Sequence, residues 1–256
     1  MSRMSEQRDC REDPGGIRME SLGRFSLGFE RGGKLLGLSH EALGGLLNQA
    51  DYRFDCGDGR VFVPAGWDEC FPTIEPFDAS PVMGDLIGVE PCIQRDRHSV
   101  RQTWTFPRYD VERVFSGSGT DRMKVEFTVR NRTAVPIPFL WASHALFSVE
   151  GLSRVELPDG TSLDQFARDG TCRKWFVQNR APVIMHRDSG RVSIRSDQPY
   201  WGLWLNRGGW PASGHAGVAC LGVEATTTAG EIPAGRHLAP GESFTGQVEV
   251  DVELTR

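Results

Sequence analysis

The feature that most constrains the fold is a two-residue alternation of apolar and polar side chains in segments far apart in the chain. Apolar residues occupy every second position of 122–131, and the same pattern returns in 248–254. Successive side chains of a β-strand point to opposite faces, so this pattern predicts strands with one buried face. Further strands are predicted at 24–30, 34–39, 100–106, 109–115, 138–149, 152–157, 174–178, 182–187, 190–196, 200–206 and 216–224.

Many short strands separated by turns favour an all-β fold, a large antiparallel β-sandwich. Thirty glycines and fifteen prolines supply the turn residues that such a fold requires. Helical spacing is confined to 39–50 and 162–167, which predict two short helices. The polar residues 1–18 are predicted to form a disordered tail, and 19–256 a single β-sandwich domain.

Charge and hydropathy argue against two classes of partner. The formal net charge is -5, and lysine and arginine are scattered singly rather than clustered as phosphate binding requires. No apolar run reaches the length needed to span a membrane. We therefore expect neither a nucleic-acid nor a membrane partner, whereas the sequence leaves the oligomeric state open.

The cysteines and histidines predict neither disulfides nor a metal site. None of the six cysteines belongs to a CxxC pair, and the first sixteen residues contain no apolar leader segment. We therefore expect buried free thiols and a cytoplasmic protein. The six histidines form no close His-x-His or His-xxx-His pair, so no metal ligation is expected.

A first group of chemically active residues follows Gly66. Trp67, Asp68 and Glu69 place an indole beside two carboxylates, between a glycine and the proline at position 72. A strand would send the two carboxylates to opposite faces, whereas a loop would present both, and we expect a loop. Carboxylate oxygens beside an aromatic ring suit a sugar, which offers hydroxyl donors and an apolar C–H face. The alternative is a turn whose acidic residues are only solvated.

Two further strands each carry one titratable residue in apolar surroundings. His144 lies within 139–147, where it is either a hydrogen-bonded core residue or a general acid facing a cavity. Glu224 ends the apolar strand 219–224, and a carboxylate is costly to bury without partners. It is either satisfied by threonine hydroxyls and backbone amides or acts as a general base.

A third group surrounds a tryptophan-rich strand. We expect a ligand to stack on the aromatic rings of Trp204 and Trp210 and to form hydrogen bonds with Asn206. The alternative is that packing in the core explains one or two of the tryptophan rings in this segment. Arg101 is a candidate partner for a substituent on the ligand, and its alternative is a solvated surface position.

Together these segments resemble the galactose mutarotase-like (aldose 1-epimerase) superfamily. The matching pieces, in chain order, are 66–73, 141–144, 202–206, 222–224 and the Leu-Ala-Pro-Gly-Glu-Ser segment 238–243. The resemblance implies the large antiparallel sandwich of that superfamily, with an open cleft that binds a hexose. It also implies a mechanism without a cofactor, in which Glu224 matches the base and His144 the acid of ring opening.

The sequence departs from the superfamily pattern at a second histidine that is expected after the Phe-Pro-Thr segment. Met83 stands there instead. Three interpretations follow. The leading one is an aldose 1-epimerase-like isomerase that binds a small-molecule sugar and interconverts its anomers. The alternative is a non-catalytic carbohydrate-binding protein of the same fold, and a metal-dependent β-sandwich enzyme ranks third.

Overall fold

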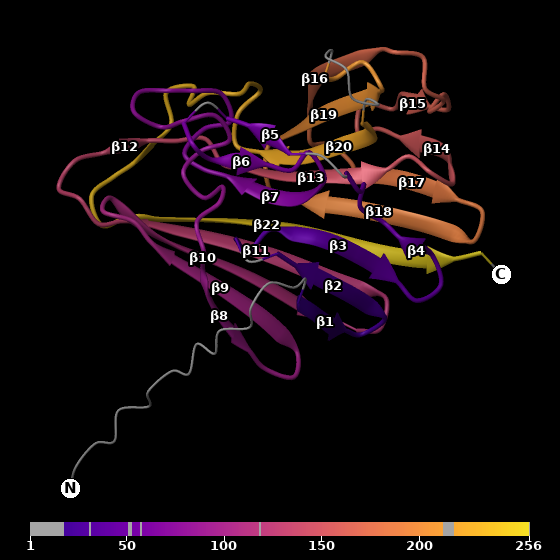
Figure 1. Cartoon of the computed structure of the whole chain (residues 1–256), viewed down its shortest axis with the longest axis horizontal. Coiled ribbons are helices and arrows are strands. Elements are labelled where there is room, and N and C mark those ends of the chain that lie inside the picture. The colour runs from indigo at the N-terminus through magenta and orange to yellow at the C-terminus, as the bar shows by residue number, and fades with distance from the viewer. Residues whose placement is uncertain are drawn as a thin grey trace, which may run out of the picture.

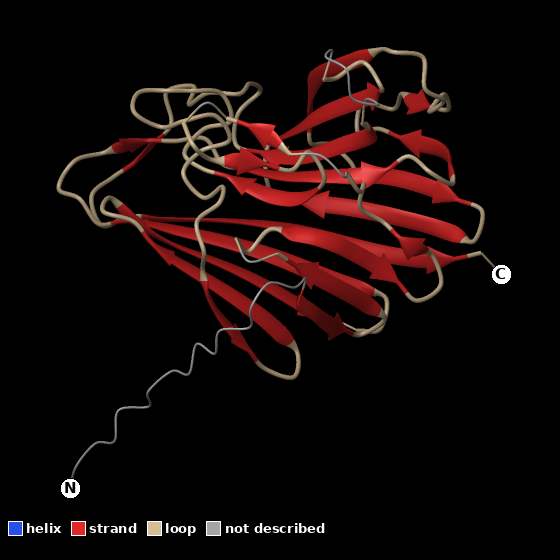
Figure 2. Cartoon of the chain, viewed as in Figure 1, coloured by secondary structure: helices blue, strands red, loops and turns tan. Residues whose placement is uncertain are grey.

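The computed structural model describes residues 18–255, apart from residues 31, 51–52, 57, 118 and 212–217. The described residues form strands and loops without a helix (Figures 1 and 2). The strands are β1 (Arg18–Leu22), β2 (Phe25–Phe29), β3 (Leu35–His40), β4 (Gly44–Gly45), β5 (Phe54–Asp55), β6 (Val61–Phe62), β7 (Gly66–Cys70), β8 (Cys92–Arg95), β9 (Ser99–Thr105), β10 (Tyr109–Gly117), β11 (Arg122–Asn131), β12 (Ile137–Pro138), β13 (Ala142–Ser148), β14 (Leu152–Glu156), β15 (Ser162–Leu163), β16 (Cys172–Gln178), β17 (Val183–Arg187), β18 (Gly190–Ser196), β19 (Tyr200–Arg207), β20 (Ala219–Thr226), β21 (His237–Leu238) and β22 (Ser243–Leu254).

Two large sheets make up the sandwich. The first sheet has the order β1-β2-β3-β7-β13-β20-β19-β16, with β4 paired to β3. The second sheet has the order β15-β14-β17-β18-β22-β11-β10-β9-β8. All the pairings between neighbouring strands of these sheets are antiparallel, as predicted. The all-β sandwich expected from the alternation is therefore confirmed.

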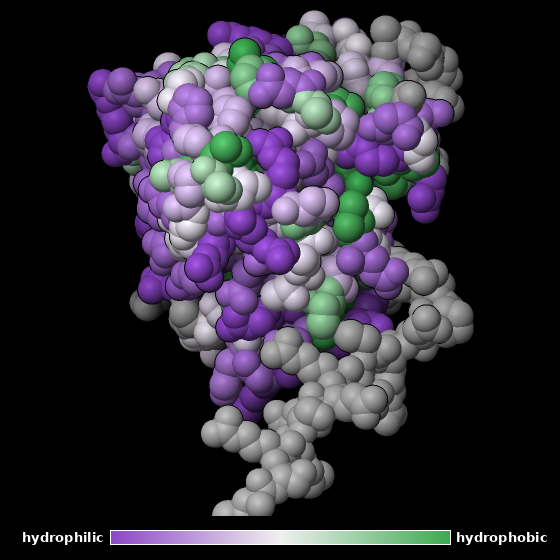
Figure 3. Space-filling view, turned by 90° about the vertical axis from the view of Figure 1, so that its left-hand side faces the viewer, coloured by the Kyte–Doolittle hydropathy of each residue, from purple (hydrophilic) through white to green (hydrophobic). Residues whose placement is uncertain are grey.

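The core lies where the facing sides of the two sheets meet. The alternating residues of β11 are buried there, and Trp141 packs over Phe127 with the two rings stacked at 5.4 Å. Gly246 of β22 leaves room for that indole, because a Cβ at this position would lie 2.3 Å from the Trp141 ring. On the face drawn in Figure 3, hydrophobic side chains occur as separate small patches among hydrophilic ones.

The two predicted helices are wrong. Residues 39–50 contain the end of β3, the short strand β4 and turns, and 162–167 contain β15 and a loop. The reason is that strands β3 and β13 of the first sheet supply the backbone partners. The amide of Leu46 donates to the carbonyl of Leu38, and the amide of Asn48 donates to the carbonyl of Leu146. These long-range bonds replace the i to i−4 bonds that a helix would need.

The predicted tail, residues 1–18, lies outside the described residues up to residue 17. Arg18 already belongs to β1, which pairs with β2 from Arg18 to Leu22. Strand β1 therefore begins one residue before the predicted domain boundary. Among the described residues there is no helix long and apolar enough to cross a membrane.

Burial of the cysteines differs from the expectation. Cys70 and Cys220 are buried free thiols, as predicted. Cys56 and Cys92 are only half-buried and Cys172 is exposed on the edge strand β16, so the prediction of burial is wrong for these three, while Cys10 lies outside the described residues. An edge strand lacks a neighbour on one side, and its side chains therefore remain partly in solvent.

Candidate active site in a cleft on the first sheet

The floor of the candidate site follows from the register of four neighbouring strands. His144 of β13 lies directly opposite Asp68 of β7 on one side and Glu224 of β20 on the other, and Glu224 lies opposite Gly202 of β19. Residues opposite each other in antiparallel strands point to the same face. The alternation places this row on the outer face of the first sheet, because the neighbouring residues Ala145 and Val223 face the core.

Glu224 is the centre of a charge cluster on this floor. Its Oε1 lies 3.3 Å from Nε2 of His144, and its Oε2 lies 3.2 Å from Nζ of Lys174. Lys174, on β16, also lies 2.5 Å from Oε1 of Glu231. Although these distances are short, neither oxygen of Glu224 accepts a well-aligned hydrogen bond, and Nδ1 of His144 is also buried without a partner. The cluster therefore retains unused hydrogen-bonding capacity.

Burial and charge act in opposite directions on this cluster. Desolvation raises the pKa of Glu224, but Lys174 and His144 outweigh it and hold the pKa below its usual value. Desolvation lowers the pKa of His144, and the nearby Glu224 offsets only part of this effect. Glu224 is therefore an ionised carboxylate at neutral pH, whereas the imidazole is mostly neutral.

Two glycines make room for the Glu224 carboxylate. A Cβ at Gly202 would lie 3.0 Å from Oε2 of Glu224 and 3.1 Å from the ring of Phe176. A Cβ at Gly222 would lie 3.0 Å from Cβ of Trp204 and 3.4 Å from Oε1 of Glu224. A larger residue at Gly202 would press on the carboxylate itself, whereas a larger residue at Gly222 would press mainly on Trp204.

We expect Gly202→Ala to destabilise the protein by about 1–3 kcal/mol, because overpacking forces neighbours out of low-energy positions. Urea unfolding measures the change. Gly37→Ala is the matched control on β3 of the same sheet, since its nearest neighbour would be 3.7 Å from the new Cβ. Equal stability of the two variants would show that the space beside Glu224 is not tight.

A cleft of about 230 Å³ opens above this floor. His144, Lys174 and Glu231 line it together with an apolar and aromatic wall. Trp204 and Trp210, both predicted to contact a ligand, lie in this wall with their rings 5.6 Å apart in an edge-on arrangement. Met83, which stands where the superfamily pattern has a histidine, also lines the cleft.

Asn206 shapes a loop rather than the cleft. Its side-chain oxygen accepts bonds from the amides of Gly208, Gly209 and Trp210, and its Nδ2 donates to the carbonyl of Trp210. The side chain is fully buried and makes no contact with the cleft. Asn206 is therefore not placed to form the expected hydrogen bond with a ligand in the cleft. Its side chain instead fixes the backbone of the loop that carries Trp210.

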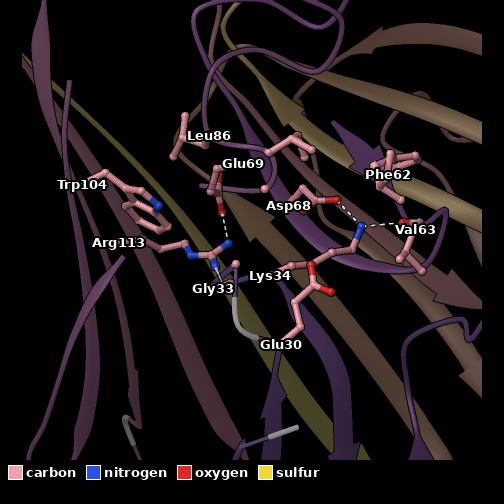
Figure 4. Close-up of a pocket in the computed structure, with 14 residues that line it drawn as sticks. Glu30, Gly33, Lys34, Phe62, Val63, Asp68, Glu69, Leu86, Trp104 and Arg113 are labelled. Carbon is pink, nitrogen blue, oxygen red and sulfur yellow. Dashed lines mark hydrogen bonds and ion pairs between the residues drawn. The ribbon is translucent and has the colours of Figure 1, made fainter. Parts of the chain in front are cut away.

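The expected loop at 67–69 is a strand, and its two carboxylates point to opposite sides. Figure 4 shows Asp68 directed toward Lys34 and Glu69 directed toward Arg113. Nζ of Lys34 lies 2.5 Å from Oδ2 of Asp68 and also donates to the carbonyl of Val63. Both carboxylates are buried, so the alternative of solvated acids is wrong as well. Asp68 shares the outer face with His144 but lines a small cavity beside the cleft.

Trp67 and Glu69 belong to the core. Trp67 is fully buried and donates its indole N–H to Ser143, which in turn donates to Glu69 at 3.1 Å. Trp141 donates to the second oxygen of Glu69 at 2.8 Å, and Arg113 lies 3.7 Å away. These contacts place both residues behind the sheet, away from the cleft. The two-residue period of β7 keeps both side chains out of the cleft, although Glu69 lines the small cavity shown in Figure 4.

Burial raises the pKa of Glu69 to about 7, against the opposing effects of Arg113 and the two hydrogen bonds. The folded protein then binds a proton more tightly than the unfolded chain. The contribution of Glu69 to stability is thus fully present below about pH 4.5 and is lost as the pH rises through 7. We expect a loss of about 3 kcal/mol across this interval.

Urea unfolding at pH 5 and pH 8 measures this loss. Glu69→Gln removes the titration while keeping the shape, so it should flatten the pH dependence of stability relative to the unmodified protein. A slope of the same size in both proteins would assign the effect to another group.

Arg101 lies far from the cleft. It is on β9 of the second sheet, where its exposed guanidinium pairs with Glu112 of β10. The prediction that it contacts a ligand is wrong, and the alternative of a solvated surface arginine holds. Conversely, Lys174 and Glu231 line the cleft but were not predicted as site residues. Lys174 begins the predicted strand 174–178, and this position is the sign that the sequence offers of its importance. Its contact with Glu224 depends on the pairing of β16 with β19.

Among the residues that the structure describes, no group of three or more histidine, cysteine or acidic residues could hold a metal ion. A scan against protein-family models finds no match for the sequence, and a search of curated proteins finds none either.

Solved structures, by contrast, match along nearly the whole chain. The Slr1438 protein from Synechocystis sp. PCC 6803 has a TM-score of 0.67 at 15% identity, over 98% of this chain and all of its own. A galactose mutarotase-like protein from Lactobacillus casei gives 0.64 at 16% identity, over 93% of this chain and 100% of that one. A galactose mutarotase related enzyme from Lactobacillus acidophilus gives 0.64 at 11% identity, over 93% and 97%.

The chain has the galactose mutarotase-like fold. The resemblance inferred from five short segments is confirmed at this level. Within the mutarotase-like fold, the floor of the cleft carries His144 and Glu224 on adjacent strands. Identities of 11–16% establish the architecture alone, and the chemistry of this cleft has to be argued from its own residues.

Proposed function

We propose that this protein binds an aldose in the cleft and interconverts its anomers. The single observation that supports the proposal most is the contact of His144 with Glu224, 3.3 Å apart on neighbouring strands at the floor of the cleft. Anomer interconversion needs one group that removes a proton and one that supplies it, on either side of the C1–O5 bond of the sugar. An ionised carboxylate beside an imidazole meets this need.

Each proton has a defined destination in the reaction. Glu224 takes the proton of the C1 hydroxyl while His144, in the minor fraction of molecules in which its imidazole is protonated, gives a proton to the ring oxygen O5. The C1–O5 bond breaks and C1 becomes an aldehyde carbon. Rotation about the C1–C2 bond presents the other face of the aldehyde to O5. Ring closure returns the proton of O5 to His144 and the proton of Glu224 to O1, so both side chains regain their starting state.

Binding requires a rearrangement at Lys174. Glu224 is fully buried, and His144 and Lys174 contact its carboxylate. Lys174 is partly exposed and has a second carboxylate partner in Glu231. It can therefore release Glu224 and keep an ion pair while the C1 hydroxyl takes its place. Trp204 and Trp210 supply aromatic surface for the C–H face of the ring.

A second candidate function is sugar binding without turnover. Two observations favour it. Met83 occupies the cleft where the superfamily pattern has a second histidine, and the low pKa of Glu224 weakens this carboxylate as a base. A protein that only holds its ligand would need the aromatic wall but no proton transfer.

The test is anomer exchange measured by polarimetry and by NMR exchange spectroscopy on a panel of aldoses. The proposal expects exchange faster than the spontaneous rate in proportion to protein concentration. Binding seen by calorimetry without faster exchange would select the second function. The absence of both binding and exchange would refute both candidates.

A further inference from the structure

The charge of the cleft is the first observation that restricts its ligand. Glu75 and Glu231 line the cleft and Glu224 lies beneath it, whereas Lys174 is the one lysine or arginine among the described lining residues. That lysine already lies within 3.2 Å of both Glu224 and Glu231. Three formal negative charges therefore face one positive charge, and His144 adds none because burial lowers its pKa.

The lysine and arginine side chains next to the cleft already pair with other groups of the protein. Lys34 contacts Asp68 and the carbonyl of Val63 in the adjacent small cavity (Figure 4). Arg60 pairs with Asp58 and donates at 2.6 Å and 2.9 Å to the carbonyls of residues 84 and 82. An anionic group entering the cleft would meet carboxylates and no available ammonium or guanidinium group among these residues.

The wall of the cleft is the second observation. Phe62, Ile74 and Met83 belong to one buried hydrophobic cluster, against which Cys56 and Val82 pack. All five residues line the cleft. Among the described lining residues, His144 and Lys174 come from the sheet, Glu231 comes from a loop, and Glu75 borders the apolar wall next to Ile74. Apart from Glu75, one side of the cleft is therefore polar and the other side is apolar, which suits a ligand with the same division.

We infer that the cleft selects an uncharged aldose whose carbons remote from C1 carry an apolar substituent, such as a 6-deoxyhexose, over sugar phosphates and other anionic sugars. The inference rests on the proposed function, because it places C1 at His144 and Glu224. The remote end of the ring then lies against the wall formed by Phe62, Ile74 and Met83.

The physical reason is the difference between a methyl and a hydroxymethyl group at that wall. A hydroxyl that loses water without gaining a partner costs about 1–3 kcal/mol, and an apolar pocket discriminates against it by roughly ten- to a hundred-fold. A phosphate would in addition be repelled by the uncompensated carboxylates. Selectivity against the phosphate should therefore exceed selectivity against the parent hexose.

The experiment compares sugars that differ only at C6. Calorimetry is performed with D-galactose, 6-deoxy-D-galactose and D-galactose 6-phosphate, and with the corresponding D-glucose and L-galactose series. We expect the 6-deoxy member of at least one series to bind about ten-fold or more tightly than its parent. We expect the 6-phosphate of that series to bind more weakly than the parent.

Met83→Asn provides the matched variant. Met83 has a φ of 63°, a backbone conformation that asparagine adopts more readily than methionine, so the fold should be retained. An amide at this position gives a hydroxyl a partner. We expect the preference for the 6-deoxy sugar to fall by about ten-fold relative to the unmodified protein.

The outcomes separate this inference from the proposed function. Equal or tighter binding of the parent hexose or of the phosphate overturns the inference, while anomer exchange of that sugar would leave the proposed function standing. A clear preference for the 6-deoxy sugar without exchange supports the inference and refutes catalysis. No binding of any sugar in the three series overturns both.

Discussion

Glu224→Gln is expected to lower the rate of anomer exchange by about 10²–10⁴-fold, the usual loss when a general acid–base group is removed. Glutamine fills the same space between Gly202 and Gly222, but its amide cannot take the proton of the C1 hydroxyl. Binding should be weakened much less, because the aromatic wall is unchanged. Exchange spectroscopy measures the rate, and calorimetry measures the affinity on the same sample.

The matched control is Glu126→Gln. Glu126 lies on β11 of the second sheet and pairs with Lys124 at the surface, so this variant makes the same chemical change away from the cleft. It should exchange anomers at the unmodified rate. An exchange rate in Glu224→Gln equal to that of the control would refute the role of Glu224 as the base.

Trp141→Ala is expected to destabilise the protein by about 3–5 kcal/mol, the range for deleting a buried aromatic side chain. The indole is almost fully buried, stacks on Phe127 and donates to Glu69. Its removal leaves a cavity over Gly246 and takes one hydrogen bond from a buried carboxylate. Urea unfolding at pH 7 measures the loss.

Trp141→Phe separates the two contributions, because it keeps an aromatic ring and removes only the N–H donor and part of the volume. Its cost should be about 1–3 kcal/mol. Trp175→Ala is the control for tryptophan removal as such, since Trp175 is only half-buried on the edge strand β16. A loss in Trp141→Ala no larger than in Trp175→Ala would show that the indole is not part of the central core.

Most of the fold could be predicted because its strands obey a short-range rule. Alternation in 122–131 requires only that one face be buried, and β11 has this pattern throughout. The short strands and turns of 39–50 could not be predicted in the same way. Their hydrogen-bond partners include Leu38 in the neighbouring strand β3 and Leu146 in the distant strand β13, and the spacing of apolar residues carries no information about these pairings.

The site was only partly accessible to sequence reasoning. His144 and Glu224 were detectable because a titratable residue in an apolar strand needs a partner, and the register makes them neighbours. The error at Trp67 and Glu69 came from expecting a loop where Gly66 begins a strand that alternates between cleft and core. Lys174 was missed because its approach to Glu224 depends on the order of β16, β19 and β20, which no local pattern specifies.

The strict alternation of β7 has a consequence for how such proteins can change over time. A single-residue insertion or deletion within β7, β13 or β20 would exchange inner and outer faces, sending carboxylates into the core and indoles into the cleft. Such strands can accept substitutions but not changes of length. The loop that carries Met83 is free of this restriction. New ligand preferences should therefore arise through changes in the loops that border the cleft, while the strands beneath it keep their length.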